Sequence, residues 1–67
     1  MVTITARNDS YVSGKRTRLW DVIRDGKIVA QMSKSSEAFA KYRILAGPVY
    51  RNDFTNQSAA LAFCEAL

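Results

Sequence analysis

The side chains that most often carry out catalysis are scarce in this sequence. It contains no His, which excludes histidine acid–base catalysis and histidine metal ligation. Its single cysteine, Cys64, excludes an internal disulfide and a metal site made of cysteines alone. No two carboxylates form a motif, and there is no glycine-rich phosphate loop or nucleophile elbow. We therefore expect a protein that is not an enzyme and that holds neither a cofactor nor a metal.

Asp21 and Cys64 are the two reactive residues that lie among apolar neighbours. A buried carboxylate can act as a general acid or base, so a catalytic Asp21 is one interpretation. The other is a position at the rim of the core, or a salt bridge to an Arg such as Arg7. Cys64 ends an apolar run that begins at Ala59, which is typical of a small core residue. A reactive thiol is the alternative, but no base lies near Cys64 in the sequence.

The basic residues are more informative. Ten Lys and Arg stand against six Asp and Glu, so the net charge is +4. Residues 1–34 hold seven of the basic residues and three of the acids, and therefore carry the whole excess. The densest cluster lies at residues 15–18, and two more basic residues flank a predicted hairpin turn on the same face as Trp20. The candidate nucleic-acid-binding residues are Lys15, Arg16, Arg18, Trp20, Arg24 and Lys27.

A basic β-hairpin suits nucleic acid for several physical reasons. A two-stranded ribbon fits the major groove of DNA, and Lys and Arg side chains attract phosphates. Arg can also read the edge of guanine with two hydrogen bonds, and a Trp on a basic sheet face can stack on an unpaired base. We therefore expect a small binding module that contacts nucleic acid through this hairpin.

The same residues support a second hypothesis, in which the partner is a protein with an acidic surface. Trp and Arg are common anchors of protein interfaces, and a charge of +4 is ordinary for a small domain. An accessory or inhibitor protein of the kind that phages and mobile elements make would use Trp20 and an apolar C-terminal helix as its interface. That helix is also the expected contact of a homodimer. The sequence leaves both hypotheses open.

The hairpin that carries the basic residues is the strongest local signal. Asp25-Gly26 separates two runs rich in β-forming residues and is typical of a type I′ turn, which needs positive φ at both central residues. A two-residue loop predicts a register along both strands. The expected partners are Arg24 and Lys27, Ile23 and Ile28, Val22 and Val29, and Trp20 and Gln31. The face expected to meet the core contains Leu19, Asp21, Ile23, Ile28, Ala30 and Met32.

Two helices are predicted after the hairpin. Ser33 is a suitable N-cap and Gly47-Pro48 a suitable stop for the first, and a short strand follows at residues 48–51. The second begins near Asn56 and runs to the C-terminus, and either Thr55 or Asn56 can cap it. Its expected apolar stripe is Ala59, Ala60, Phe63, Ala66 and Leu67, with Leu61 and Cys64 outside it.

Residues 2–7 alternate between apolar and polar, which predicts a further strand. The element order is then β-β-β-α-β-α, in the α+β class: a small antiparallel three- to four-stranded sheet with two helices, in one domain of residues 1–67. No stretch is apolar enough to cross a membrane, and the N-terminus lacks the pattern of a signal peptide. We therefore expect a cytoplasmic protein without membrane contact.

Overall fold

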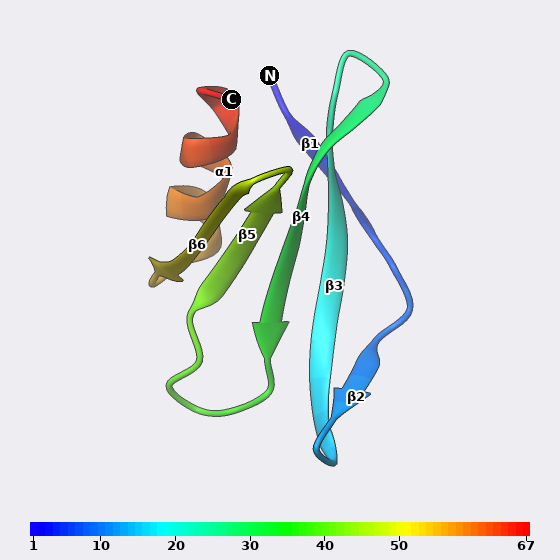
Figure 1. The fold of residues 1–67 in the computed structure, drawn as a ribbon, viewed down its shortest axis with the longest axis vertical. Helices are drawn as coiled ribbons and strands as arrows, with labels where there is room; N and C mark the ends of the chain where they lie inside the picture. Colours follow the sequence, from blue (N-terminus) through cyan, green and yellow to red (C-terminus); the bar gives the residue numbers. More distant parts are fainter.

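The computed structural model describes residues 1–67, except for the side chain of Val12. Within this description the protein is mostly β, with a six-stranded antiparallel sheet followed by one helix. The predicted order β-β-β-α-β-α, with a three- to four-stranded sheet and two helices, is therefore wrong. The strands are β1 (Thr3–Ala6), β2 (Ser10–Val12), β3 (Lys15–Arg24), β4 (Lys27–Ser35), β5 (Tyr42–Ala46) and β6 (Val49–Phe54), and the helix is α1 (Gln57–Glu65). β1 and β2 lie end to end along one side of β3, and the remaining strands follow in sequence order (Figure 1).

Three two-residue turns connect neighbouring strands. Asp25 and Gly26 have φ angles of 54° and 77°, which confirms the predicted type I′ turn. Ser13 and Gly14 form a second turn of this kind, with φ angles of 54° and 76°. The third turn joins β5 to β6, with Gly47 at a φ of 59° and Pro48 after it. Because such turns reverse the chain within two residues, they produce hairpins in succession.

The helix predicted from Ser33 to Ala46 is wrong. β4 continues to Ser35, the chain crosses a loop, and it returns as β5. Met32 in β4 lies directly opposite Ile44 in β5, and both side chains are fully buried. A helix would separate these two residues, and Ser-rich segments are poor helix interiors. Gly47-Pro48 therefore acts as a hairpin turn and not as a helix stop.

The predicted register of the β3–β4 hairpin is correct only beside its turn. Ile23 lies opposite Ile28 as expected, but Val22 then lies opposite Ala30, because the register shifts by one residue at this point. A shift of one residue moves every following side chain to the other face. As a result Trp20, Val22, Ala30 and Met32 share the core face. The core face predicted for β3 is wrong, because Leu19, Asp21 and Ile23 lie on the opposite face with the exposed Ile28.

α1 packs against the sheet and completes the core. Of the two predicted caps, Asn56 is the one used, since its side chain accepts a hydrogen bond of 2.8 Å from the Ala59 N–H. Ala60 and Cys64 are fully buried, and the ring of Phe63 lies 5.4 Å from that of Phe54. The predicted stripe is partly wrong: Ala66 and Leu67 are exposed, and Cys64 faces the core instead. Almost every residue from 59 to 64 is apolar, so the pattern does not determine which side of the helix is buried.

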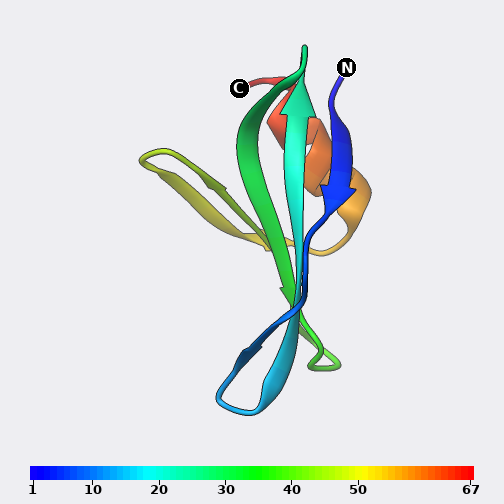
Figure 2. The same ribbon diagram turned by 90° about the vertical axis from the view of Figure 1, so that its right-hand side faces the viewer.

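The molecule is elongated, with principal extents of 35 × 22 × 21 Å, and β3 follows its long axis (Figure 1). One end, which we call the terminal end, holds both chain termini and the Asp25–Gly26 turn. The other, the β2 end, holds the Ser13–Gly14 turn and the loop of residues 36–41. Figure 2 shows the β5–β6 hairpin projecting away from the side on which α1 lies. Among the described residues no helix combines the length and the apolar character needed to cross a membrane.

Candidate nucleic-acid interface

The six residues predicted to bind nucleic acid do not meet at one place. β3 is ten residues long, and at about 3.3 Å per residue its ends are roughly 30 Å apart. Lys15, Arg16 and Arg18 therefore lie at the β2 end, whereas Arg24 lies at the terminal end together with its cross-strand partner Lys27. The six residues therefore form two groups at opposite ends of β3 and not one compact cluster.

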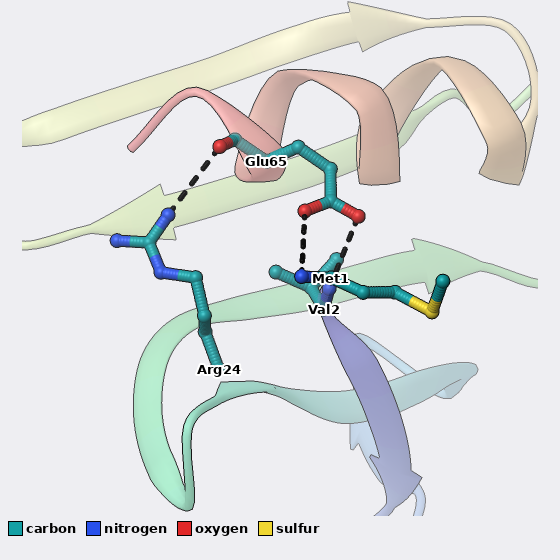
Figure 3. A network of polar contacts seen from close by, with 4 residues as sticks. All are labelled: Met1, Val2, Arg24 and Glu65. Carbon is teal, nitrogen blue, oxygen red and sulfur yellow. Dashed lines mark hydrogen bonds and ion pairs between the residues drawn. The ribbon is translucent and has the colours of Figure 1, made fainter.

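At the terminal end the charged groups hold the fold together. Nη1 of Arg24 donates a hydrogen bond of 3.4 Å to the backbone oxygen of Glu65 in α1 (Figure 3). The Glu65 carboxylate accepts a 3.0 Å hydrogen bond from the Val2 N–H and lies 3.6 Å from the amino group of Met1. This network joins β3, the N-terminus and the helix, so Arg24 has a structural partner at this end.

The terminal end is also balanced in charge. Asp21 lies 3.6 Å from Nη1 of Arg7, which confirms the salt bridge that the sequence analysis considered for it. Three basic and three acidic side chains lie outside the β2 end: Arg7, Arg24 and Lys27, with Asp21, Asp25 and Glu65. Their sum is zero, so the net charge of the protein resides elsewhere.

The β2 end carries the whole net charge of the protein. Besides the Arg51–Asp53 pair of β6 (2.8 Å), whose charges cancel, it holds six cations and two carboxylates, which leaves +4: Lys15, Arg16, Arg18, Lys34, Lys41 and Arg43, with Asp9 and Glu37. The last three cations were absent from the predicted site. Folding brings them there because residues 33–46 form two strands and a loop and not a helix. Interpreting Gly47-Pro48 as a hairpin turn would have placed Arg43 beside the basic residues of β3 and β4.

Arg18 and Lys34 form the centre of this end on the face that α1 partly covers. They lie directly opposite each other on β3 and β4, where like charges repel. The guanidinium carbon of Arg18 is 5.4 Å from the ring centre of Trp20, and Nζ of Lys34 is 5.7 Å from that of Tyr42. Among the described side chains neither cation has a carboxylate within 4.0 Å. Aromatic faces thus stabilise two cations whose charges stay uncompensated.

Trp20 has a different position from the one predicted. Its side chain is 9% exposed, and its ring lies 6.0 Å from that of Tyr42 in the core. Stacking on a base requires an exposed ring, which Trp20 does not offer. The exposed aromatic residue on this face is Tyr11, which is 71% exposed and lies opposite Arg16 across β2 and β3. Arg16 itself is paired with Asp9.

A hollow of about 500 Å³ opens at the same end, on the opposite face of the sheet. Three cations line it, namely Lys15, Lys41 and Arg43, together with Glu37 and two exposed aromatic residues. Lys15 and Glu37 form an ion pair there. The hydrogen bond and the charge of Lys15 hold the pKa of Glu37 below its usual range, so this carboxylate is ionised at neutral pH.

The structure also places the residues that were considered for other chemistry. Cys64 is buried in the core, which confirms its interpretation as a packing residue. Burial raises the pKa of its thiol, and the nearby charge of Glu65 raises it further. Within the described part of the chain no three His, Cys, Asp or Glu side chains gather as metal ligands would.

No family model matches this chain, and no curated protein or solved structure shows significant similarity to it. The charge, the shape and the exposed groups of the β2 end are therefore the features that bear on function.

Proposed function

We propose that this protein is a non-enzymatic nucleic-acid-binding module and that its binding surface is the β2 end. The observation that carries the proposal is that the entire net charge of +4 lies there. Arg18 and Lys34 support it most directly, because they face each other without a neighbouring carboxylate. A polyanion that binds here relieves their repulsion. The proposed surface keeps Lys15, Arg16 and Arg18 from the predicted set and leaves out Trp20, Arg24 and Lys27.

Binding of this kind has a defined salt dependence. Each phosphate that a cation neutralises releases condensed counterions, so the affinity falls as the salt concentration rises. If the net charge corresponds to about four phosphate contacts, a plot of log affinity against log salt has a slope of about −3.6 on duplex DNA, and about −2.8 on a single strand.

The proposal is tested by fluorescence anisotropy with labelled duplex DNA, single-stranded DNA and RNA at low salt. The informative variant is Lys34→Gln, with Lys27→Gln as its control at the terminal end, since each removes one positive charge. We expect Lys34→Gln to weaken binding several-fold and Lys27→Gln to leave it nearly unchanged. Lys34→Gln also removes the repulsion with Arg18, so unfolding does not account for a loss of binding.

Two results would overturn the proposal. The first is the absence of a complex with all three nucleic acids at low salt. The second is an equal loss of affinity in Lys34→Gln and Lys27→Gln, which would indicate attraction by net charge without a defined surface.

The alternative, a protein-binding accessory or inhibitor protein, has less support from its expected anchors. Trp20 is buried, and α1 turns Ala60, Phe63 and Cys64 toward the sheet. A homodimer through α1 would have to use the other side of the helix, where Ser58, Ala62 and Glu65 are exposed. An acidic protein partner would bind the same β2 end, and failure to bind any nucleic acid favours that alternative.

A further inference from the structure

The hollow at the β2 end is built from four strands and a loop that are distant in sequence. It lies on the sheet face opposite α1, between the start of β3, the end of β4, β5, β6 and the loop of residues 36–41. Its volume of about 500 Å³ is within the range of small-molecule sites, which is roughly 300 to 1,000 Å³.

The floor of the hollow is polar. Thr17 and Ser35 lie directly opposite each other on β3 and β4, and both line the hollow. Thr17 is only 7% exposed, and among the described side chains it is the one polar residue that is buried. Asn52 on β6 lines it as well. Hydroxyl and amide groups of this kind both donate and accept hydrogen bonds, as the edge of a base or a sugar requires.

The wall of the hollow is cationic. Glu37 pairs with Lys15, whereas Lys41 and Arg43 have no carboxylate within 4.0 Å among the described residues. Asp53 lies near Lys41, but it is paired with Arg51. The remaining charge is therefore positive, and it lies close to the polar floor. This arrangement favours a ligand that combines an anionic group with a polar body.

Two aromatic rings complete the hollow. Phe39 lies in the loop and is 96% exposed, and Tyr50 lies on β6 and is 54% exposed. Phe39 gains almost nothing from packing in the folded protein, since its side chain is in contact with solvent. Exposed rings beside cations are the usual means by which proteins hold unpaired bases.

We infer that this hollow binds one unpaired nucleotide of a single-stranded nucleic acid. Lys41 and Arg43 contact its phosphate, and Tyr50 or Phe39 stacks on its base. In a duplex the faces of each base are covered by its neighbours, so the rings can stack only on an unpaired base. This inference rests on the proposed function, which it narrows from nucleic acid in general to single strands.

The test measures the affinity of the protein for a short oligothymidylate, an oligouridylate and a duplex of the same length. The variants are Phe39→Ala and Tyr50→Ala, with Tyr11→Ala as the matched control, because Tyr11 is an exposed Tyr at the same end but on the other face. Urea denaturation of each variant verifies that it folds, and the exposure of Phe39 makes a folding defect unexpected in its variant.

We expect preferential binding of the single strands, whichever sugar they carry. Phe39→Ala and Tyr50→Ala should each weaken that binding roughly tenfold and leave duplex binding unchanged, and Tyr11→Ala should have the smaller effect. The inference is overturned if duplex and single strands bind equally and both variants bind like the parent protein; the proposed function then still stands. It is also overturned if Tyr11→Ala alone weakens binding. If no nucleic acid binds at all, the proposed function fails together with the inference.

Discussion

Two neighbouring residues of β5 show how strongly burial alternates along a strand. Ile44 is fully buried against the core, and Leu45, on the other face, is 50% exposed. Truncating a buried Ile to Ala costs about 2–5 kcal/mol, and a domain of this size is stable by only about 3–5 kcal/mol. We therefore expect Ile44→Ala to be largely unfolded.

Leu45→Ala is the control for this prediction and should change the free energy of unfolding by only about 0.5 kcal/mol. Urea denaturation followed by circular dichroism measures both variants. Equal losses in the two variants would mean that the assignment of sheet faces is wrong.

At the β2 end, two cations that suit the proposed binding lower the stability of the fold. Arg18 and Lys34 repel each other across two strands, and their contacts with Trp20 and Tyr42 only partly offset this cost. Trp20 thus supports the Arg18 cation from inside the core. The predicted cation Arg18 is present at this end, but the ring of Trp20 contacts it from inside the core.

At the scale of elements, the short helix α1 depends on its N-terminal cap. The Asn56 side chain accepts a hydrogen bond from Ala59, and no acidic residue stands in the first turn. We expect Asn56→Ala to lower the free energy of unfolding by about 1 kcal/mol, because it leaves a backbone N–H without its partner. Asn56→Asp keeps the acceptor and adds a negative charge near the positive end of the helix.

The Asp variant should therefore be at least as stable as the parent protein. The midpoints of urea denaturation compare the three proteins. If Asn56→Asp is as unstable as Asn56→Ala, the cap does not account for the stability of α1.

Turns with positive φ set the geometry of the hairpins. The register between paired strands decides which side chains lie on each face of the sheet. The irregularity near Val22 and Ile23 brings Ala30 opposite Val22 and leaves Val29 as an extra residue in β4. Because of this one residue, Trp20 and Met32 meet in the core. Element boundaries alone do not reveal such a shift.

At the scale of the whole molecule, charge is separated along the 35 Å axis, with +4 at the β2 end and zero elsewhere. A protein with this distribution approaches a polyanion with its basic end first. In the binding mode that we propose, the terminal end, where Glu65 joins α1 to the N-terminus, does not contact the polyanion.

The dependence of stability on pH follows from the perturbed groups. Ion pairs with Lys15 and Arg51 lower the pKa of Glu37 and Asp53, so the folded state binds these protons less tightly than the unfolded chain. Stability is then complete above the ordinary carboxyl range and is lost as the pH falls through the lowered pKa values. Burial raises the pKa of Cys64, so its contribution is complete below the ordinary thiol pKa and is lost as the pH rises.

Between these limits the protein has no His side chain to titrate. We expect a plateau in the midpoint of urea denaturation from about pH 6 to 8, with a decline on each side. Cys64→Ala should reduce the alkaline decline and leave the acid decline unchanged. A clear change of the midpoint within the plateau would contradict this prediction.

The sequence by itself determined the features that depend on residues close together in the chain. The type I′ turn at Asp25-Gly26, the pairs beside it and the cap of α1 at Asn56 all follow from local backbone preferences. The concentration of positive charge among residues 15–18 was also evident from the sequence.

Only the tertiary structure decided which face of each strand is buried, whether residues 33–46 form a helix, and where the net charge lies. These features depend on contacts between distant residues, such as Met32 with Ile44. An apolar segment like 42–46 fits a helix or a strand equally well until a partner strand lies beside it. That pairing brings Lys34, Lys41 and Arg43 to the β2 end, and the candidate site therefore exists only in the folded chain.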